Sequence, residues 1–425
     1  MTSLRIIERG GDESSPGREP FEAIEARLRE RLARGGDSAA VDAVDLILIQ
    51  AVPHRASDIH FEPWRDSLTI RYRIDGILHD VAQLPREFHA WITTRLKVIA
   101  RIATYHRDVP QDGRIEPDAT PSGRAMRVST FPTVNGEKVT VRMLDTPDGM
   151  LALDALGFDA DLTGALQELI GRPSGTLLLT GPSSSGKTTT IYALLQAIVQ
   201  SRDPAPHVVA IEDPVEYRMP KITQTEINPH TGLTYEEALR AVLRQDPEVI
   251  MLGEIRDPAT AHAAIQAGLT GHLVISTIHS GTAAGVFTRL LDMGIEPFLI
   301  ASSVTGVLAQ RLVRKNCPAC SAPVVPDERL CARFGVVPES GTFRAGSGCP
   351  NCEGIGFRGR TAVGELLMAD ETVAELILSR ARTATIHRAA VVAGMTSLED
   401  AALACAETGI TTLDEMRRVL PAGMT

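Results

Sequence analysis

The sequence has few aromatic residues, no long apolar run and no apolar leader segment. Phe, Trp and Tyr make up 4% of its 425 residues, so the stacking platforms that bind single-stranded nucleic acid are not expected. The longest apolar stretch, near Phe298 to Ala309, contains hydroxyl side chains and is too short to span a bilayer. The opening segment at 1–9 is short and charged, unlike the apolar core of a secretory leader. These absences predict a cytoplasmic protein without direct membrane insertion.

The chain also lacks an excess of positive charge. Its net charge is −10 and its isoelectric point is about 5.6, which weighs against a nucleic-acid duplex as the main partner. Its 44% hydrophobic content is ordinary for a globular protein. At ~150 residues per domain, the length predicts about two to four domains.

The most informative motif present is Gly181-Pro-Ser-Ser-Ser-Gly-Lys-Thr188, which fits the phosphate-binding loop pattern G-x-x-x-x-G-K-[ST]. An apolar strand at 176–180 precedes it and a helix at 188–200 follows, as this loop requires. Successive N–H groups and the helix N-terminus supply positive potential for phosphate. Lys187 is expected to reach the β/γ-phosphates and the Thr188 hydroxyl to ligate Mg²⁺. The predicted nucleotide-binding residues are Gly181, Pro182, Ser183, Ser184, Ser185, Gly186, Lys187, Thr188 and Thr189.

Strands and helices alternate after the motif, which predicts an α/β fold with a parallel, doubly wound sheet of the RecA-like P-loop type. Short strands and a helix before it predict a smaller α+β domain, with paired strands around the Asn135-Gly136 turn. The expected divisions are a flexible N-terminal segment at 1–39 that includes a short helix at 21–34, the α+β domain at 40–145, a linker at 146–150, the ATPase core at 151–316, a zinc module at 317–360 and a helical C-terminal region at 361–425.

Two apolar strands end in carboxylates. The strand at 247–253 is followed by Glu254, which we predict to polarise the attacking water beside the phosphate loop. The strand at 208–211 is followed by Glu212 and Asp213, which could support the water shell of a bound metal ion. A solvated acidic turn set by Pro214 accounts for this second pair equally well.

Two histidines bracket a further strand. His272 begins it and His279 ends it, so they are not a simple metal-binding pair. His279 is expected at the carboxyl edge of the sheet, where ligands of open α/β sheets bind, and could sense the γ-phosphate. His272 fits a structural role equally well.

Four of the six cysteines form two CxxC pairs. Cys317 with Cys320, and Cys349 with Cys352, can present four thiolates to one tetrahedral Zn²⁺. Such a closed site is structural. The other two cysteines fit no pair and are expected to be ordinary buried side chains.

With these residues placed, the chain resembles the secretion ATPase superfamily of type II secretion and type IV pilus assembly. The resemblance covers roughly residues 40–420, and its tetracysteine module is similar to that of the secretion and pilus-extension branch. The matching stretches, in family order, are SDIHFEP at 57–63, RYRIDG at 71–76, QDGR at 111–114, RVST at 127–130, the phosphate loop, IEDPVE at 211–216, LRQDP at 243–247, GEIRD at 253–257, TGH at 270–272, STIH at 276–279 and QRLVR at 310–314.

This resemblance implies a homo-hexameric ATP-hydrolysing motor that drives pseudopilus or pilus assembly through an inner-membrane platform protein. The protein would associate with the inner membrane only through partners. Two family arginines from the small domain, matching Arg114 and Arg127, would reach the phosphates and complete the site. The alternative for each is a surface ion pair. ATP is preferred over GTP because no N-K-x-D segment occurs.

Two of the departures from the family pattern carry structural expectations. Ser184 stands where the family usually has glycine, which predicts a negative φ at this residue. Only residues 1–39 precede the matched region, which predicts that the usual N-terminal docking domain is absent.

Two other functions also remain open. One is a nucleic-acid-translocating RecA-like ATPase whose zinc module grips DNA. The other is a slow-turnover nucleotide switch that acts as a scaffold. A DNA-stimulated rate, or slow hydrolysis with partners present, would distinguish them from the motor.

Overall fold

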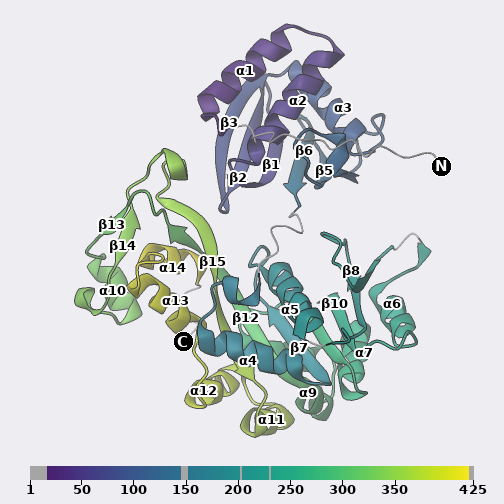
Figure 1. Ribbon diagram of the computed structural model, residues 1–425, viewed down its shortest axis with the longest axis vertical. Coiled ribbons are helices and arrows are strands. Elements are labelled where there is room, and N and C mark those ends of the chain that lie inside the picture. The colour runs from purple at the N-terminus through teal and green to yellow at the C-terminus, as the bar shows by residue number, and fades with distance from the viewer. Residues whose placement is uncertain (1–16, 145–151, 202, 229–230, 421–425) are drawn as a thin grey trace, which may run out of the picture. The chain divides into compact units, whose positions relative to one another are not determined.

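The chain folds into two compact units, Met1–Thr146 and Pro147–Thr425 (Figure 1). The computed structural model describes residues 17–144, 152–201, 203–228 and 231–420. The predicted linker at 146–150 lies outside these residues, as does the start of the predicted flexible segment.

The first unit is an antiparallel six-stranded sheet in the order β3-β2-β1-β6-β5-β4. Alternation of apolar and polar residues gives the sheet one buried face; in β2, Leu68, Ile70 and Tyr72 are buried while their neighbours are half-buried. Its elements are α1 (Phe21–Ala33), α2 (Asp37–Ala51), β1 (Ala56–Pro63), β2 (Ser67–Ile74), β3 (Ile77–Pro85), α3 (Phe88–Ile99), β4 (Gln111–Ile115), β5 (Met126–Thr133) and β6 (Gly136–Met143). The predicted hairpin is confirmed: β5 pairs with β6 around the Asn135-Gly136 turn.

Helix α1 corrects one expectation. The predicted flexible segment at 1–39 includes a short helix at 21–34, but this helix, α1, belongs to the first unit. Ile24, Leu28 and Leu32 lie one turn apart, and all three are buried in a core shared with α2 and the sheet. The apolar stripe therefore indicated packing as well as helix formation.

The second unit is a seven-stranded sheet in the order β15-β12-β7-β11-β10-β8-β9. The strands from β12 to β9 are parallel neighbours, as predicted. Strand β15 is different, because it runs antiparallel to β12 and forms the edge. The strands are β7 (Gly175–Thr180), β8 (Val208–Glu212), β9 (Ile222–Glu226), β10 (Val249–Ile255), β11 (Leu273–Ile278), β12 (Val304–Asn316) and β15 (Phe357–Met368).

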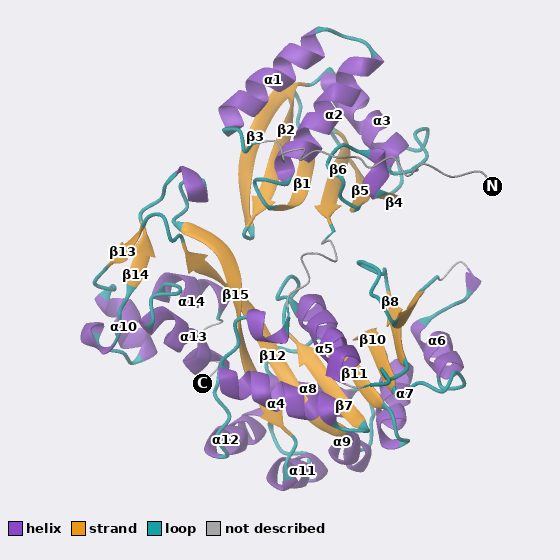
Figure 2. Ribbon diagram, in the orientation of Figure 1, coloured by secondary structure: helices purple, strands orange, loops and turns teal. Residues whose placement is uncertain are grey.

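Helices cover both faces of this sheet (Figure 2). Strands that are buried on both sides have almost continuous apolar sequences, as in Leu177-Leu178-Leu179 of β7. Leu177 and Leu179 pack with α4 (Ala160–Gly171) and α5 (Lys187–Ser201), whereas Leu178 faces the opposite core. The helices of that opposite core are α6 (Tyr235–Val242), α7 (Pro258–Leu269), α8 (Ala283–Asp292), α9 (Pro297–Ser303), α11 (Glu371–Leu378) and α12 (Thr383–Val392).

The C-terminal part continues from the long strands β12 and β15. Their connection carries β13 (Ser321–Pro323), α10 (Glu328–Phe334) and β14 (Arg344–Gly346). Helices α13 (Leu398–Glu407) and α14 (Leu413–Val419) pack with α10 against Val313 and Val363 of the two strands. The predicted boundary between the zinc module at 317–360 and the helical region at 361–425 is wrong, because residues 357–368 form β15 of the main sheet and the helices after it begin with α11. Within the described residues, no helix is both long and apolar enough to cross a membrane.

Candidate functional site

The phosphate loop lies between β7 and the start of α5, at the carboxyl edge of the parallel sheet. Gly181 has φ 151°, and a Cβ there would meet the Gln310 carbonyl oxygen at 2.6 Å. Gly186 has φ 90°. The loop backbone therefore passes close to β12 where only glycine fits. Residues 182–184 are exposed, and together with the first turn of α5 the loop could bind an anion.

Ser184 has φ 62°, so the predicted negative φ is wrong. The loop must turn back sharply between two glycines, and a left-handed residue produces that turn and helps direct N–H groups inward. The cost is of order 1–3 kcal/mol for a residue other than glycine. The Ser184 side chain is exposed, so it meets no additional packing conflict.

Lys187 begins α5, and its ammonium group folds back over the loop. Nζ donates to the carbonyl oxygens of Gly181 at 2.8 Å and Pro182 at 3.0 Å. Burial lowers the pKa of Lys187; the Glu254 carboxylate opposes this shift and the Arg311 guanidinium adds to it. A phosphate would be a stronger, charge-assisted acceptor than these neutral carbonyls. Thr188 and Thr189 follow with exposed side chains.

Gln310 of β12 holds the phosphate loop in place, a role that no sequence motif predicted for it. The side chain is fully buried, and its Nε2 donates to the Ser185 carbonyl at 2.7 Å. The next residue, Arg311, donates to the Gln310 carbonyl and to the Gly281 carbonyl, each at 2.9 Å. This pair joins the phosphate loop to the segment after β11. The one sequence signal for Gln310 and Arg311 is their place in the QRLVR stretch at 310–314.

Glu254 lies near the end of β10, on the same sheet edge as the loop. The register between β10 and β11 shifts between Leu252 and Ile255, so β10 carries an extra residue there. Such a bulge re-aims side chains and is common next to active sites. The Glu254 carboxylate pairs with Arg256, and its Oε2 is 3.6 Å from Nε2 of His279.

The structure thus brings together two residues that the sequence placed on separate strands. His279 follows β11 directly, at the predicted carboxyl edge, and its side chain is 60% exposed. His272 is at the other end of the strand, and its Nδ1 is 3.1 Å from the Ala267 carbonyl. His272 therefore makes a structural hydrogen bond at the end of α7, in keeping with the structural role that fitted it.

Glu212 ends β8 and is 3% exposed, so the alternative of a solvated turn does not fit it. Its carboxylate accepts from the Tyr192 hydroxyl and, at 2.9 Å, from Gln224 Nε2. Burial raises the pKa of Glu212, although these two hydrogen bonds oppose the shift. Because Tyr192 belongs to α5, Glu212 ties the end of β8 to the helix that begins with Lys187.

Arg114 and Arg127 lie in the first unit, directly opposite one another on β4 and β5. Each makes the surface ion pair that was the alternative reading: Arg114 Nε is 3.7 Å from Glu116, and Arg127 is 3.4 Å from Asp112. Exposed pairs of this kind contribute about 0–1 kcal/mol. Like charges placed directly across two strands are destabilising, so stability alone does not account for this arrangement.

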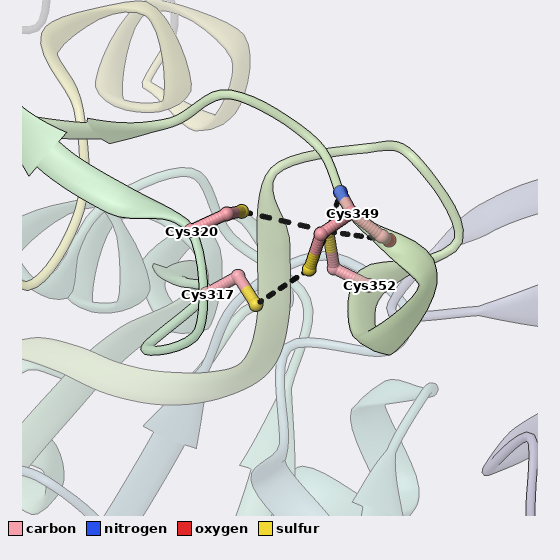
Figure 3. A group of neighbouring side chains, drawn as sticks. All are labelled: Cys317, Cys320, Cys349 and Cys352. Atoms are coloured by element: carbon pink, nitrogen blue, oxygen red, sulfur yellow. Dashed lines mark hydrogen bonds between the residues drawn. The ribbon is translucent and has the colours of Figure 1, made fainter.

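Cys317, Cys320, Cys349 and Cys352 converge from the two ends of the β12–β15 connection, with their sulfur atoms turned toward one another (Figure 3). All four sulfurs lie within 4.8 Å of each other, and the closest pairs are 3.7–3.9 Å apart. A tetrahedral site with Zn–S bonds of about 2.3 Å requires sulfurs about 3.8 Å apart. The cluster is consistent with zinc binding.

Backbone donors favour a thiolate in this cluster. The N–H groups of Cys349 and Gly356 donate to Cys352 Sγ at 3.2 and 3.3 Å. Burial would raise the pKa of the Cys352 thiol, but these donors and the neighbouring thiols outweigh it and lower the pKa to about 7. A metal ligand must be deprotonated, so this arrangement suits one.

Comparison with known proteins gives matches along almost the whole chain. The profile of the family described as "Type II/IV secretion system protein" matches residues 34–418. Type II secretion system ATPase E of Vibrio cholerae is 44% identical over 387 residues, which are 90% of this chain and 76% of that protein. Type IV pilus assembly ATPase PilB of Myxococcus xanthus is 42% identical over 413 residues, 96% of this chain and 71% of PilB.

Two solved structures share the fold. The pilus retraction motor PilT with bound ADP has a TM-score of 0.62 at 23% identity, and the match covers 89% of this chain and 97% of PilT. The ATPase DotB of Yersinia pseudotuberculosis has a TM-score of 0.66 at 20% identity, covering 89% and 93%. At these identities the likeness concerns the fold alone.

Proposed function

Because the chain belongs to the type II/IV secretion system protein family, we propose that it is an ATP-hydrolysing motor for a type II secretion or type IV pilus system. The observation that carries the proposal is the shared sheet edge: the phosphate loop, Glu254 and His279 meet where α/β sheets bind ligands. The more specific proposal is that turnover drives pseudopilus or pilus assembly through an inner-membrane platform protein.

In the proposed mechanism, the loop amides and Lys187 hold the phosphates of ATP. The hydroxyl of Thr188 would hold Mg²⁺, which offsets the charge on the phosphate oxygens when bound. Glu254 orients and polarises the attacking water, and His279 next to it responds to the γ-phosphate. Glu212 is buried and holds α5 through Tyr192. In this way it supports the end of α5 where Thr188 would hold the metal ion.

Arg114 and Arg127 are proposed to complete the site by contacting the phosphates. Each forms an ion pair with an exposed carboxylate, which a phosphate can replace as a bidentate acceptor with more charge. Hydrolysis would then depend on the first unit as well as the second. This dependence would make the rate sensitive to conformation, which is the property a motor needs.

A hexamer and a platform partner are the assembly that we propose. The test is native mass spectrometry of the purified chain, followed by co-purification with a polytopic platform protein from the same gene neighbourhood. The expected result is a six-subunit species that retains the platform protein. A monomer that does not bind the platform protein, and whose hydrolysis rate is raised by DNA, would favour a nucleic-acid motor instead.

Zinc is proposed to hold the β12–β15 connection together. Zinc binding contributes about 10–16 kcal/mol in zinc-finger peptides at neutral pH, so Cys349→Ser should lose the metal and loosen residues 317–356. Metal analysis should give one zinc per wild-type chain and a small fraction of that in the variant, with faster hydrogen exchange in this segment.

Cys405→Ser is the matched control, because Cys405 lies outside the cluster. It should keep its full zinc content. Normal zinc content and slow exchange in Cys349→Ser would contradict the proposed role of the metal.

A further inference from the structure

Glu365 of β15 is a buried carboxylate that the proposed mechanism does not use. It is 1% exposed and lies opposite Ala309 on β12, so its side chain shares a face of the sheet with that of Arg311, two residues further along. A buried charge is costly unless it is well paired. The partners of Glu365 therefore indicate what it does.

Its two oxygens bind the first residues of two different helices. Oε1 accepts from the N–H of Ala283, which begins α8, at 2.8 Å. Oε2 accepts from the N–H of Leu398, which begins α13, at 3.2 Å. Helix N-termini carry unsatisfied N–H groups and positive potential, so one carboxylate stabilises both. His387 of α12 approaches Oε2 at 3.6 Å, and Arg311 adds a favourable charge interaction.

The helix held by Oε1 is the one that follows the His279 segment. We call residues 279–282 the His279 loop. The loop is fixed at three places. Ser280 N–H donates to Thr180 Oγ1 at 2.9 Å, and the Gly281 carbonyl accepts from Arg311 at 2.9 Å. The Glu365–Ala283 hydrogen bond holds its far end. Since Thr180 directly precedes Gly181, the loop is tied to the start of the phosphate loop.

Each helix already has its own cap. Thr282 accepts from Gly285 N–H, and Ser397 accepts from Asp400 N–H. The helices therefore do not need Glu365 to begin where they do. What Glu365 adds is a fixed position of the His279 loop relative to β15 and α13.

We propose that Glu365 is a positioning residue for hydrolysis: it holds the His279 loop in register with the sheet edge so that His279 stays beside Glu254. This inference rests on the proposed function, because it assigns a role to the loop in ATP turnover. One consequence is that α13 and the His279 loop share a single anchor, which links the C-terminal helices to the nucleotide site.

The test compares Glu365→Gln with two other variants. Glutamine keeps the shape but removes the charge and turns an NH₂ group toward one backbone donor. Ala283→Pro removes the N–H that Glu365 binds, at the first position of α8, which tolerates proline, and adds two ring carbons to a fully buried side chain. Glu375→Gln, at an exposed position on α11, is the control for loss of a charge.

The expected result is a split between binding and turnover. In Glu365→Gln and Ala283→Pro, kcat should fall about 10- to 100-fold, because a displacement near 1 Å costs about that much. KM for ATP and the affinity for a non-hydrolysable analogue should stay within about threefold of wild type, and Glu375→Gln should be unchanged. If Glu365→Gln does not fold, the kcat of Ala283→Pro tests the inference by itself.

Combination with His279→Ala shows whether the effect passes through the loop. The double variant should be no more than about threefold slower than the slower single variant, because residues that act as a unit are not additive. The inference would be overturned if the double variant lost kcat by the product of the two single reductions, or if His279→Ala turned over at the wild-type rate. It would also be overturned if folded Glu365→Gln or Ala283→Pro kept the wild-type kcat. Absence of turnover in the wild-type chain would instead contradict the proposed function.

Discussion

Replacing both Arg114 and Arg127 by alanine is expected to lower kcat for ATP by about 10³- to 10⁵-fold, the range for arginines that stabilise phosphoryl transfer. The physical reason is loss of two guanidinium groups that would offset charge on the transferring phosphoryl group. Phosphate release under saturating ATP measures the effect. Lysine at both positions should restore only part of the rate, because an ammonium cannot form the bidentate contact.

Stability should change little in the same variant. The ion pairs of Arg127 with Asp112 and of Arg114 with Glu116, at 3.4 and 3.7 Å, lie at the surface, and such pairs contribute about 0–1 kcal/mol. Removing two like charges from opposite positions on β4 and β5 offsets part of that loss. Arg34→Ala, which breaks an exposed pair with Glu30 on the surface of the same unit, is the control. A double variant that turns over at the wild-type rate would remove both arginines from the site.

Glu254→Gln is expected to bind nucleotide normally and to lose about 10²- to 10⁴-fold in kcat, the usual contribution of a general base. The amide preserves the size of the side chain and can still accept a hydrogen bond, but it cannot polarise water as a carboxylate does. Filter binding of ATP, together with phosphate release, separates the two effects.

Glu248 provides a matched control for this change. It directly precedes the same strand, at the end opposite Glu254, and accepts from the His207 N–H at 3.1 Å. Glu248→Gln should hydrolyse ATP at nearly the wild-type rate. Equal turnover in Glu254→Gln and wild type would show that another group activates the water.

Local signals made much of the second unit predictable. The strand before the phosphate loop, the loop and α5 each depend on neighbours in sequence, and all three occur where the pattern indicated. Glu254 and His279 could be assigned to one edge because parallel strands have their carboxyl ends on the same side. Their separation of 3.6 Å depends on a bulge in β10 that nothing in the sequence indicated.

Features set by long-range packing could not be predicted. Ser184 takes a positive φ because the loop turns back sharply between Gly181 and Gly186, which lie close to β12, far away in sequence. Gln310 and Glu365 acquire their partners only when β12 lies beside β7 and β15 pairs antiparallel with β12. The burial of α1 likewise depends on the sheet of the first unit.

The most direct test of the account is the rate of phosphate release from Mg²⁺-ATP by the purified wild-type chain, with Lys187→Ala measured beside it at equal zinc content. Lys187 is the one ammonium that folds over the described phosphate loop. The account predicts steady turnover in the wild-type protein and a rate near background in the variant. Equal rates in the two proteins would contradict it.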